Sequence, residues 1–540
     1  MEFNLATIFE YAVDQYPDRE FLVVGDKRCT YADMEQRANR LAHHLAAQGI
    51  GKNDHVGIYA YNCMEWVETL WAVFKIRAVW ININFRYVEE ELAYIFANAD
   101  LKALVVQGEF VERSANVIES LPLLQHVLVI DDGSVNNADS LKAIDYESAL
   151  SEQSAVRDFA PRSGDDRYML YTGGTTGMPK GVVWRHEDVF FALGGGVDQT
   201  TGEQYTEAEQ VVAKGAAFQV SLFPLAPLMH GASQWAVMGG AFEGRKIILA
   251  QQFDAEQTWR TVAREQCHGL FITGDAMARP LIEAFEQIKD EVDASSLFIL
   301  SSSAVVFSAT LKDQFIQHFP NLMLLDSIGS SETGGNGTLK VEAGNTEMKG
   351  GPTVQPGPNT VVLNQQTYEV LEPGTGEMGY LATKGFLPLG YYKDEEKTAK
   401  TFIIGPDGVR YAVPGDSALL EPDGSITMLG RGSGCINSGG EKIFPEEVES
   451  ACKNHAQIYD CVVVGVTDER WGSRVVAVIE SRDTVELSLE SVQEECRKHI
   501  ARYKVPREIH FVEKIQRAPS GKPDYRWAKT IASNASPESV

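Results

Sequence analysis

Apolar runs of strand length alternate with helical segments along the first part of the chain. The apolar run at 55–60 is followed by the helical segment 65–76 and by a second apolar run at 78–82. This strand–helix–strand order is typical of βαβ units, in which helices cover a parallel sheet. Further strand-like runs lie at 103–106, 127–130, 246–250, 269–273 and 297–301. The sequence therefore predicts an α/β fold with two βαβ-type subdomains.

The chain has 540 residues, which is more than one ordinary hydrophobic core accommodates. From 350 to about 427, short strands with Pro/Gly turns predict a small β-rich module. Three glycines within 430–434 are typical of a linker. We predict an N-terminal domain at 1–430, a hinge at 431–434 and a smaller, mobile α+β domain at 435–540. In that last domain, helices are expected at 445–453 and 489–500, and strands at 460–466, 474–480 and 508–512.

The composition disfavours certain classes of binding partner and favours one cellular compartment. A net charge of −27 disfavours binding to nucleic acid and to anionic membranes. No apolar run reaches the roughly 18 residues that span a bilayer, and the first residues lack a signal-peptide pattern. The seven cysteines are scattered and form no Cys-x-x-Cys pair. Cysteine usage of this kind favours a reducing cytoplasm over a disulfide framework or a zinc site.

A loop rich in glycine and threonine follows the strand-like segment 167–171. Glycine lets backbone N–H groups turn toward an anion, threonine hydroxyls add donors, and Lys180 adds a positive charge. A Walker motif cannot be placed here. The pattern predicts a phosphate-binding loop, with a flexible surface turn as the alternative. Its candidate residues are Thr172, Gly173, Gly174, Thr175, Thr176, Gly177 and Lys180.

Further motifs follow this loop in a fixed order: 227–231, 327–334, 414–416, 430–432, 439–443 and 519–522. Their order and spacing resemble the adenylate-forming superfamily, which includes acyl-CoA synthetases, peptide-synthetase adenylation domains and luciferases. The resemblance runs from about residue 5 to about residue 530. Within the superfamily, several stretches look like CoA ligases that act on steroid side-chain carboxylic acids. These stretches are 84–88, 184–188, 273–280, 326–334 and 522–527.

The resemblance implies a two-step reaction in which ATP and a carboxylic acid form acyl-AMP, and CoA then takes the acyl group. It assigns Lys522 to the transition state of the first step, where a cation stabilises developing negative charge. It assigns Glu332 to Mg²⁺, because a carboxylate beside a triphosphate requires a cation between them. It places His230 at the mouth of the acyl pocket. Taken singly, these would be a solvated lysine, an acid after an N-capping serine run and a core histidine.

The resemblance also assigns the remaining nucleotide and CoA contacts. For the nucleotide these are Ser302, Ser303, Ala304, Asp326, Ser327, Ile328, Gly329, Ser331, Asp416 and Arg431. For CoA they are Gly439, Gly440 and Lys442, and the hinge falls at Ser433. The chain departs from the family at Ile328, where the family usually has a tyrosine stacked on adenine. It also has Pro414 in place of the usual threonine before the ribose-binding Asp416.

The acyl substrate is the least constrained part of the interpretation. The resemblance places Met229, Ala232, Trp235 and Gly239 at the acyl pocket, where a lone Trp235 would otherwise be core. Gly239 and Gly240 leave room for a broad, rigid acid, and Gly240→Leu is expected to exclude such acids. Fatty or other small acids, transfer to a carrier protein and a non-catalytic nucleotide-binding scaffold are the alternatives. A homodimer is possible.

Overall fold

The first sheet of the computed structural model has the strand order β19-β9-β8-β4-β3-β5-β6-β7. Its central strands run parallel, and helices α4 (Glu89–Asn98) and α5 (Val111–Ile118) cover one face. Apolar strands buried on both faces are typical of such sheets. The strands are β3 (His55–Tyr59), β4 (Val79–Asn82), β5 (Leu101–Gln107), β6 (His126–Ile130), β7 (Ile144–Asp145), β8 (Arg167–Thr172), β9 (Lys180–Arg185) and β19 (Gly390–Tyr391).

The structure describes residues 3–134, 141–172, 178–193, 196–197, 203–305, 307–341, 352–431, 434–438, 441–468, 472–482, 487–518 and 521–534. For residues 431, 437, 441, 442, 472 and 534 only the backbone is described. Within these ranges, no helix combines the length and the apolar content needed to cross a bilayer.

The second sheet begins with the order β2-β1-β11-β10-β12-β13-β14. All of these strands except β2 run parallel to their neighbours. One face is covered by α10 (Ala255–Glu265), α11 (Gly274–Ile288) and α12 (Ala309–His318). The strands are β1 (Glu20–Val24), β2 (Lys27–Thr30), β10 (Ser221–Pro224), β11 (Lys246–Leu249), β12 (Gly269–Ile272), β13 (Ile299–Ser302) and β14 (Met323–Ser330).

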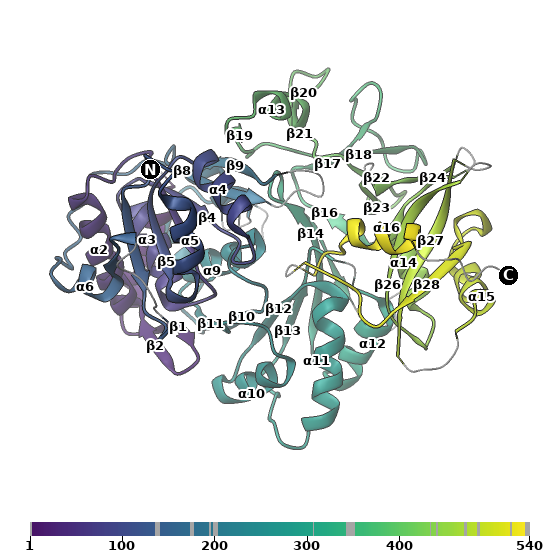
Figure 1. The fold of residues 1–540 in the computed structure, drawn as a ribbon, viewed down its shortest axis with the longest axis horizontal. Helices are drawn as coiled ribbons and strands as arrows, with labels where there is room; N and C mark the ends of the chain where they lie inside the picture. The colour runs from purple at the N-terminus through teal and green to yellow at the C-terminus, as the bar shows by residue number, and fades with distance from the viewer. Residues whose placement is uncertain are drawn as a thin grey trace.

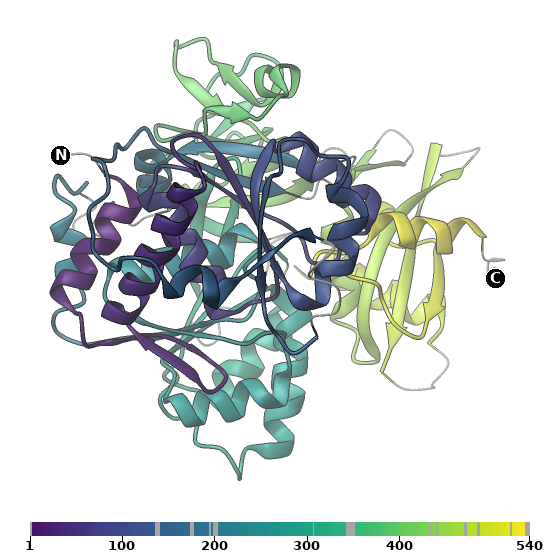
Figure 2. The same ribbon diagram turned by 60° about the vertical axis from the view of Figure 1, so that its left-hand side comes forward.

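The largest hydrophobic core lies between the two sheets. Helices α1 (Leu5–Gln15), α2 (Tyr31–Ala47), α3 (Met64–Lys75) and α9 (Gly231–Phe242) contribute to it, together with strands of both sheets. The result is an alternation of helix and sheet layers (Figures 1 and 2). The predicted α/β fold with two βαβ-type subdomains is confirmed.

The predicted β-rich module is present above these layers, in green in Figure 2. It is not a separate sheet, because β14 pairs with β15 and the second sheet continues into the module. Its strands are β15 (Gly334–Val341), β16 (Thr353–Pro356), β17 (Thr360–Asn364), β18 (Met378–Lys384), β20 (Phe402–Ile404), β21 (Arg410–Ala412), β22 (Asp416–Leu420) and β23 (Ile426–Arg431). Helix α13 (Glu395–Thr401) precedes β20.

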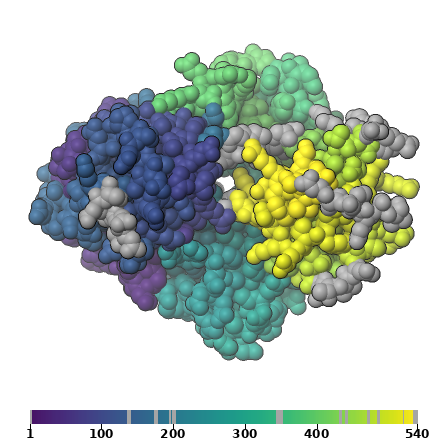
Figure 3. Space-filling model, viewed as in Figure 1, coloured from purple at the N-terminus to yellow at the C-terminus, as the bar shows by residue number. Residues whose placement is uncertain are grey.

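The C-terminal part of the chain has its own three-stranded sheet of β26 (Ile458–Asp468), β27 (Gly472–Ser481) and β28 (Glu508–Val512). Its two hydrophobic cores contain only residues from Ile436 onward. In Figure 3 this yellow part lies against the teal segment that contains α11 and α12. The remaining elements are α14 (Pro445–Lys453), α15 (Leu489–His499), α16 (Tyr525–Asn534), β24 (Ile436–Ser438) and β25 (Glu441–Ile443).

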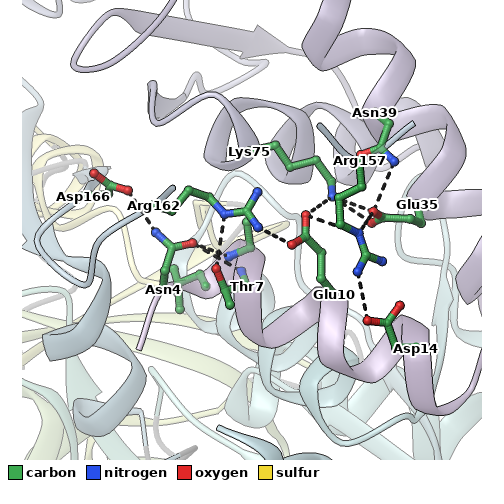
Figure 4. Close-up of polar contacts among 12 residues, drawn as sticks. Asn4, Thr7, Glu10, Asp14, Glu35, Asn39, Lys75, Arg157, Arg162 and Asp166 are labelled. Carbon is green, nitrogen blue, oxygen red and sulfur yellow. Dashed lines mark hydrogen bonds and ion pairs between the residues drawn. The ribbon is translucent and has the colours of Figure 1, made fainter. Parts of the chain in front are cut away.

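A buried group of charged side chains joins three N-terminal helices (Figure 4). Lys75 of α3 is fully buried, and its Nζ lies 2.6 Å from Glu10 Oε1 and 2.8 Å from Glu35 Oε2. From the segment after α6 (Tyr146–Ser151), Arg157 pairs with Glu35 and Arg162 pairs with Glu10. Glu35 therefore has two cationic partners, and Glu10 has three, because Arg157 Nε also lies 3.8 Å from Glu10 Oε1. We call these five residues the N-terminal charge network.

Candidate functional site

Asn82, the last residue of β4, ties the predicted phosphate loop to the turn before His230. Its side-chain Nδ2 donates to the carbonyl oxygens of Tyr171, at 2.9 Å, and Met229, at 2.7 Å. Its Oδ1 accepts from the backbone N–H of Tyr171 at 2.8 Å. Asn82 is not among the residues predicted from the sequence, although a polar side chain at the end of a buried strand is a signal that could have found it.

Both ends of the predicted phosphate loop are fixed by pairing between strands. Thr172 at the end of β8 lies opposite Lys180 at the start of β9. Lys180 Nζ lies 2.5 Å from Asp394 Oδ2, and this hydrogen bond raises the pKa of Lys180. A bound phosphate would therefore compete with Asp394 for Lys180. Gly173, Gly174, Thr175, Thr176 and Gly177 lie outside the described residues.

Glu332 is a buried carboxylate held by the first sheet. The hydroxyl of Tyr391 in β19 donates to its Oε1 at 2.7 Å. The indole of Trp184 in β9 donates to the carbonyl oxygen of the neighbouring Ser331 at 3.0 Å. A carboxylate has about four acceptor sites, so one hydrogen bond leaves room for a cation.

These residues fit a magnesium ion held largely by its substrate. The described residues contain no group of three or more His, Cys, Asp or Glu side chains arranged to hold a metal. Mg²⁺ is often bound by one or two carboxylates together with substrate phosphates. Glu332 is the carboxylate that would serve here.

The predicted adenine-side residues have identifiable structural partners. The Ser302 hydroxyl accepts from the Gly274 N–H at 3.1 Å and so caps the start of α11. Ile328 in β14 packs against the small core of the β-rich module. At Gly329, an added Cβ would lie 2.5 Å from the Gly334 carbonyl oxygen, so the tight hairpin between β14 and β15 requires glycine. Ser303 and Ala304 follow β13 directly.

The polar side chains of β14 are already engaged. Asp326 is buried, and its Oδ2 lies 2.7 Å from Lys312 Nζ of α12. The Ser327 hydroxyl lies 2.9 Å from that of Thr338 in β15. These contacts fix the strand beside the predicted nucleotide, and nucleotide contacts by Asp326 and Ser327 stay predictions.

The two ribose candidates are cross-strand neighbours. Asp416 begins β22 and lies directly opposite Arg431, the last residue of β23. Directly opposed residues in antiparallel strands have Cβ atoms about 5 Å apart. The fold therefore brings both residues to one place, as the resemblance implies. Pro414 precedes the strand.

Lys522, almost 300 residues further along the chain, lies near enough to His230 for its charge to affect the pKa of His230. Burial lowers the pKa of His230 to about 4, and the nearby charges of Lys522 and Arg86 act in the same direction. Gly521 packs against the start of α11, where an added Cβ would lie 3.0 Å from Thr273 Oγ1 and from Ala276 Cβ. The segment that carries Lys522 thus packs on the N-terminal part of the chain, and a catalytic role for Lys522 stays a prediction.

The predicted acyl-pocket residues of α9 share one stripe of the helix. Ala232, Trp235 and Gly239 are exposed or half-buried, whereas the opposite stripe is buried. A Cβ added at Gly239 would meet no heavy atom within 4 Å. Met229, just before the helix, is buried.

The prediction that Gly240 leaves room for the acyl substrate was wrong. A Cβ at Gly240 would lie 2.5 Å from Ile247 Cδ1, so this glycine faces the core between α9 and β11. Gly240→Leu would disturb packing rather than probe the acyl pocket, and Gly239 is the correct position for that test.

Several predicted residues stay untested because of where they lie in the chain. Ser433, Gly439 and Gly440 fall outside the described residues, and the side chains of Arg431 and Lys442 are not described. The backbone of Lys442 pairs with Asn437 between β24 and β25. The hinge and the CoA contacts therefore remain predictions.

Comparison with known families identifies the class. Residues 9–392 match the family described as AMP-binding enzyme, and residues 447–522 match the AMP-binding enzyme C-terminal domain. The chain therefore belongs to the AMP-binding enzyme family, and the resemblance to adenylate-forming enzymes is confirmed.

The similarity to individual curated proteins covers nearly the whole chain. A 3-oxocholest-4-en-26-oate–CoA ligase of Rhodococcus rhodochrous is 48% identical over 98% of this chain and 96% of its own length. A medium/long-chain-fatty-acid–CoA/3-oxocholest-4-en-26-oate–CoA ligase of Mycobacterium marinum is 49% identical over 97% of this chain and 96% of its own. The resemblance to ligases for steroid side-chain acids is confirmed.

Solved structures agree with the fold. The anthranilate CoA ligase AuaEII in complex with anthranoyl-AMP has a TM-score of 0.83, with 20% identity, over 99% of this chain and 98% of its own. ATP-bound MatB from Rhodopseudomonas palustris has a TM-score of 0.82, also with 20% identity, over 99% of both chains.

Proposed function

We propose that this protein is an ATP-dependent ligase that joins a bulky carboxylic acid, of the steroid side-chain type, to CoA. The observation that carries this proposal is the packing of Gly521 on the start of α11, with the charge of the next residue, Lys522, near enough to act on His230. The chemistry is the one that the two curated relatives described above are named for.

In the first step, a carboxylate oxygen of the acid attacks the α-phosphorus of ATP. The bond from this phosphorus to the bridging oxygen breaks, and pyrophosphate leaves with the electron pair. Lys522 stabilises the charge that develops on the phosphoryl oxygens. Neutral His230, with its low pKa, adds no positive charge and can hydrogen-bond the acid.

In the second step, the CoA thiol attacks the acyl carbonyl carbon of acyl-AMP. The thiol loses its proton, the carbon–oxygen bond to AMP breaks, and AMP leaves. The C-terminal domain turns about Ser433 between the steps, which withdraws Lys522 and brings the 439–442 segment to the acyl-AMP. Both the hinge and this segment rest on the resemblance.

Glu332 would hold Mg²⁺, which supplies charge neutralisation on the ATP phosphates when bound. Asp416 and Arg431 would hold the ribose, and the loop from Thr172 to Lys180 the phosphates. The proposed compartment is the cytoplasm, consistent with the scattered cysteines. A homodimer is proposed as the assembly on the resemblance alone.

The reaction is tested with Lys522→Ala. We expect acid-dependent exchange of pyrophosphate into ATP to fall at least about 100-fold, the usual scale for losing one stabilising group in the transition state. Conversion of supplied acyl-AMP to acyl-CoA should be retained. Lys529→Ala, at an exposed lysine of α16, is the matched control and should leave both rates unchanged. Equal loss of both half-reactions in Lys522→Ala would contradict the proposed roles.

The substrate class is tested at Gly239, where the structure leaves open space beside the α9 stripe. Gly239→Leu should lower kcat/KM for 3-oxocholest-4-en-26-oate at least about tenfold, because rigid rings cannot bend around an added side chain. Hexanoate should lose less than about threefold, and Gly239→Ala is the control. An unchanged ratio between the two acids would contradict a rigid, bulky substrate.

A further inference from the structure

A line of charged side chains on α11 faces the C-terminal domain. Asp275, Arg279 and Glu283 are spaced four residues apart and therefore share one face of the helix. Their partners all belong to the C-terminal domain: Lys453 at the end of α14, Tyr459 in β26 and Arg482 after β27. We call these six residues the docking seam.

The burial and the contact distances of the docking seam change along its length. At its inner end, Asp275 and Lys453 are both buried, with Asp275 Oδ2 3.6 Å from Lys453 Nζ. In the middle, the guanidinium carbons of Arg279 and Arg482 lie 5.1 and 5.7 Å from the centre of the Tyr459 ring. At the outer end, Glu283 and Arg482 are 3.3 Å apart and solvent-exposed, beside a surface hollow of about 420 Å³. The inner end and Arg279 are therefore sheltered from water, and the outer end is not.

The inner end continues to the loop that carries Lys522. Lys453 Nζ also lies 3.8 Å from Asp460 Oδ1. Both oxygens of Asp460 accept from Arg517, at 2.6 and 2.7 Å. Arg517 Nη1 in turn donates to the Gly521 carbonyl oxygen at 2.8 Å. A chain of charged contacts thus runs from α11 to the residue just before Lys522.

Asp275 is well placed to anchor this chain from the N-terminal side. Its Oδ1 accepts from the Ser308 backbone N–H at 2.7 Å, which fixes the carboxylate. Its Oδ2 makes no hydrogen bond within the described part of the chain and faces Lys453. Because Gly521 packs on Thr273 and Ala276, which flank Asp275, the chain of contacts returns to where it began.

We propose that Asp275 is a positioning residue for Lys522, acting through Lys453, Asp460 and Arg517 in the orientation that the first half-reaction uses. The long distance from Asp275 to Lys453 matches a contact that must form and release in each cycle. This inference rests on the proposed two-step function. It assigns Asp275 to the first half-reaction and to no part of the second.

The test compares Asp275→Asn with Glu283→Gln. Asparagine keeps an oxygen for the Ser308 N–H and removes only the charge facing Lys453. In Asp275→Asn, kcat for pyrophosphate exchange should fall about tenfold with KM for ATP unchanged, since breaking a buried charge pair is costly. Acyl-CoA formation from supplied acyl-AMP should stay within twofold. Glu283→Gln, at the exposed end, should leave both rates within twofold.

A second variant approaches the pair from the other side. Lys453→Gln should reproduce the selective loss, and the double variant should lose no more than the worse single one, because both remove the same interaction. Equal loss of both half-reactions, an unchanged first half-reaction, or an equal effect of Glu283→Gln would overturn the proposal.

Amide hydrogen exchange separates this proposal from the proposed function. Asp275→Asn should speed exchange in the 516–524 segment and in the first turn of α11, and leave α15 unchanged. This measurement needs no enzymatic activity. If the parent protein made neither acyl-AMP nor acyl-CoA, the proposed function would fail. Faster hydrogen exchange in Asp275→Asn would still support the docking role of Asp275, and unchanged exchange would overturn it.

Discussion

The N-terminal charge network and the docking seam are both built from buried charges, but they are built differently. In the network, Lys75 reaches two carboxylates at 2.6 and 2.8 Å, and each carboxylate has a further arginine partner. Across the seam, Lys453 lies 3.6 Å from Asp275, and within its own domain it lies 3.8 Å from Asp460. The network joins elements of one domain, whereas the seam joins two domains.

The difference shows that buried charges can form either a permanent contact or a contact that is released. Removing a charge from water is costly, and short hydrogen-bonded contacts are needed to offset that cost. The network makes such contacts and holds α1, α2 and α3 together permanently. At the buried end of the seam, the contact between the two domains is long, at 3.6 Å, so separating the two faces there and hydrating them costs little. A permanent joint and a releasable one are thus distinguished by geometry rather than by residue type.

The largest expected effect comes from breaking the network. Lys75→Met leaves Glu35 with Arg157 alone and Glu10 with only arginine partners, and removing one member of a buried pair costs about 3–5 kcal/mol. We expect the unfolding transition of the N-terminal domain, followed by tryptophan fluorescence in urea, to shift by this amount. Both half-reactions should be lost in parallel as the domain unfolds. A selective loss of the first would contradict a purely structural role.

A smaller effect is expected at the loop that closes the seam. Gly521 has φ of +76°, and its Cβ position is 3.0 Å from Thr273 and Ala276. A left-handed conformation costs a non-glycine residue about 1–2 kcal/mol. Gly521→Ala should therefore slow pyrophosphate exchange about 5- to 30-fold and spare acyl-CoA formation from acyl-AMP. Gly49→Ala is the matched control, because Gly49 has a similar φ of +79° and a Cβ there would meet no heavy atom within 4 Å.

Lowering the pH tests how much the N-terminal charge network contributes to stability. Burial raises the pKa of Glu35, but Lys75 and Arg157 outweigh it, and the net pKa is lowered. A carboxylate with a lowered pKa in the folded state contributes its full stability above the unfolded value of about 4.3. That contribution is lost as pH falls further, through the folded pKa. Urea titrations between pH 7 and pH 3 should show a shallower loss in Glu35→Gln than in the parent protein.

The smallest expected effect lies in the middle of the seam. Tyr459→Leu keeps an apolar side chain and removes the ring that Arg279 and Arg482 face. Cation–π contacts at partly exposed sites contribute about 0.5–1 kcal/mol. Pyrophosphate exchange should fall by about two- to fivefold, and Tyr459→Phe should behave like the parent protein. A loss as large as that in Asp275→Asn would shift the anchor from the carboxylate to the ring.

Much of the fold could be predicted because it depends on local patterns. Apolar runs marked β3, β4, β5 and β6, and the helix expected at 445–453 is present as α14. Periodicity reports which face of a segment is buried, and this information lies within a few neighbouring residues. The order of motifs likewise indicated the class of enzyme, because each motif is a short local segment.

What only the tertiary structure decided are the contacts between distant segments. The pairing of Asp416 with Arg431, the bridge from Asn82 to Met229 and the approach of Lys453 to Asp275 have no local sequence signal. Gly239 and Gly240 are neighbours in sequence, yet one faces open space and the other the core. The environment of a side chain depends on which surfaces pack together in the fold. A local sequence pattern gives the residue types but does not show which distant segments will be in contact.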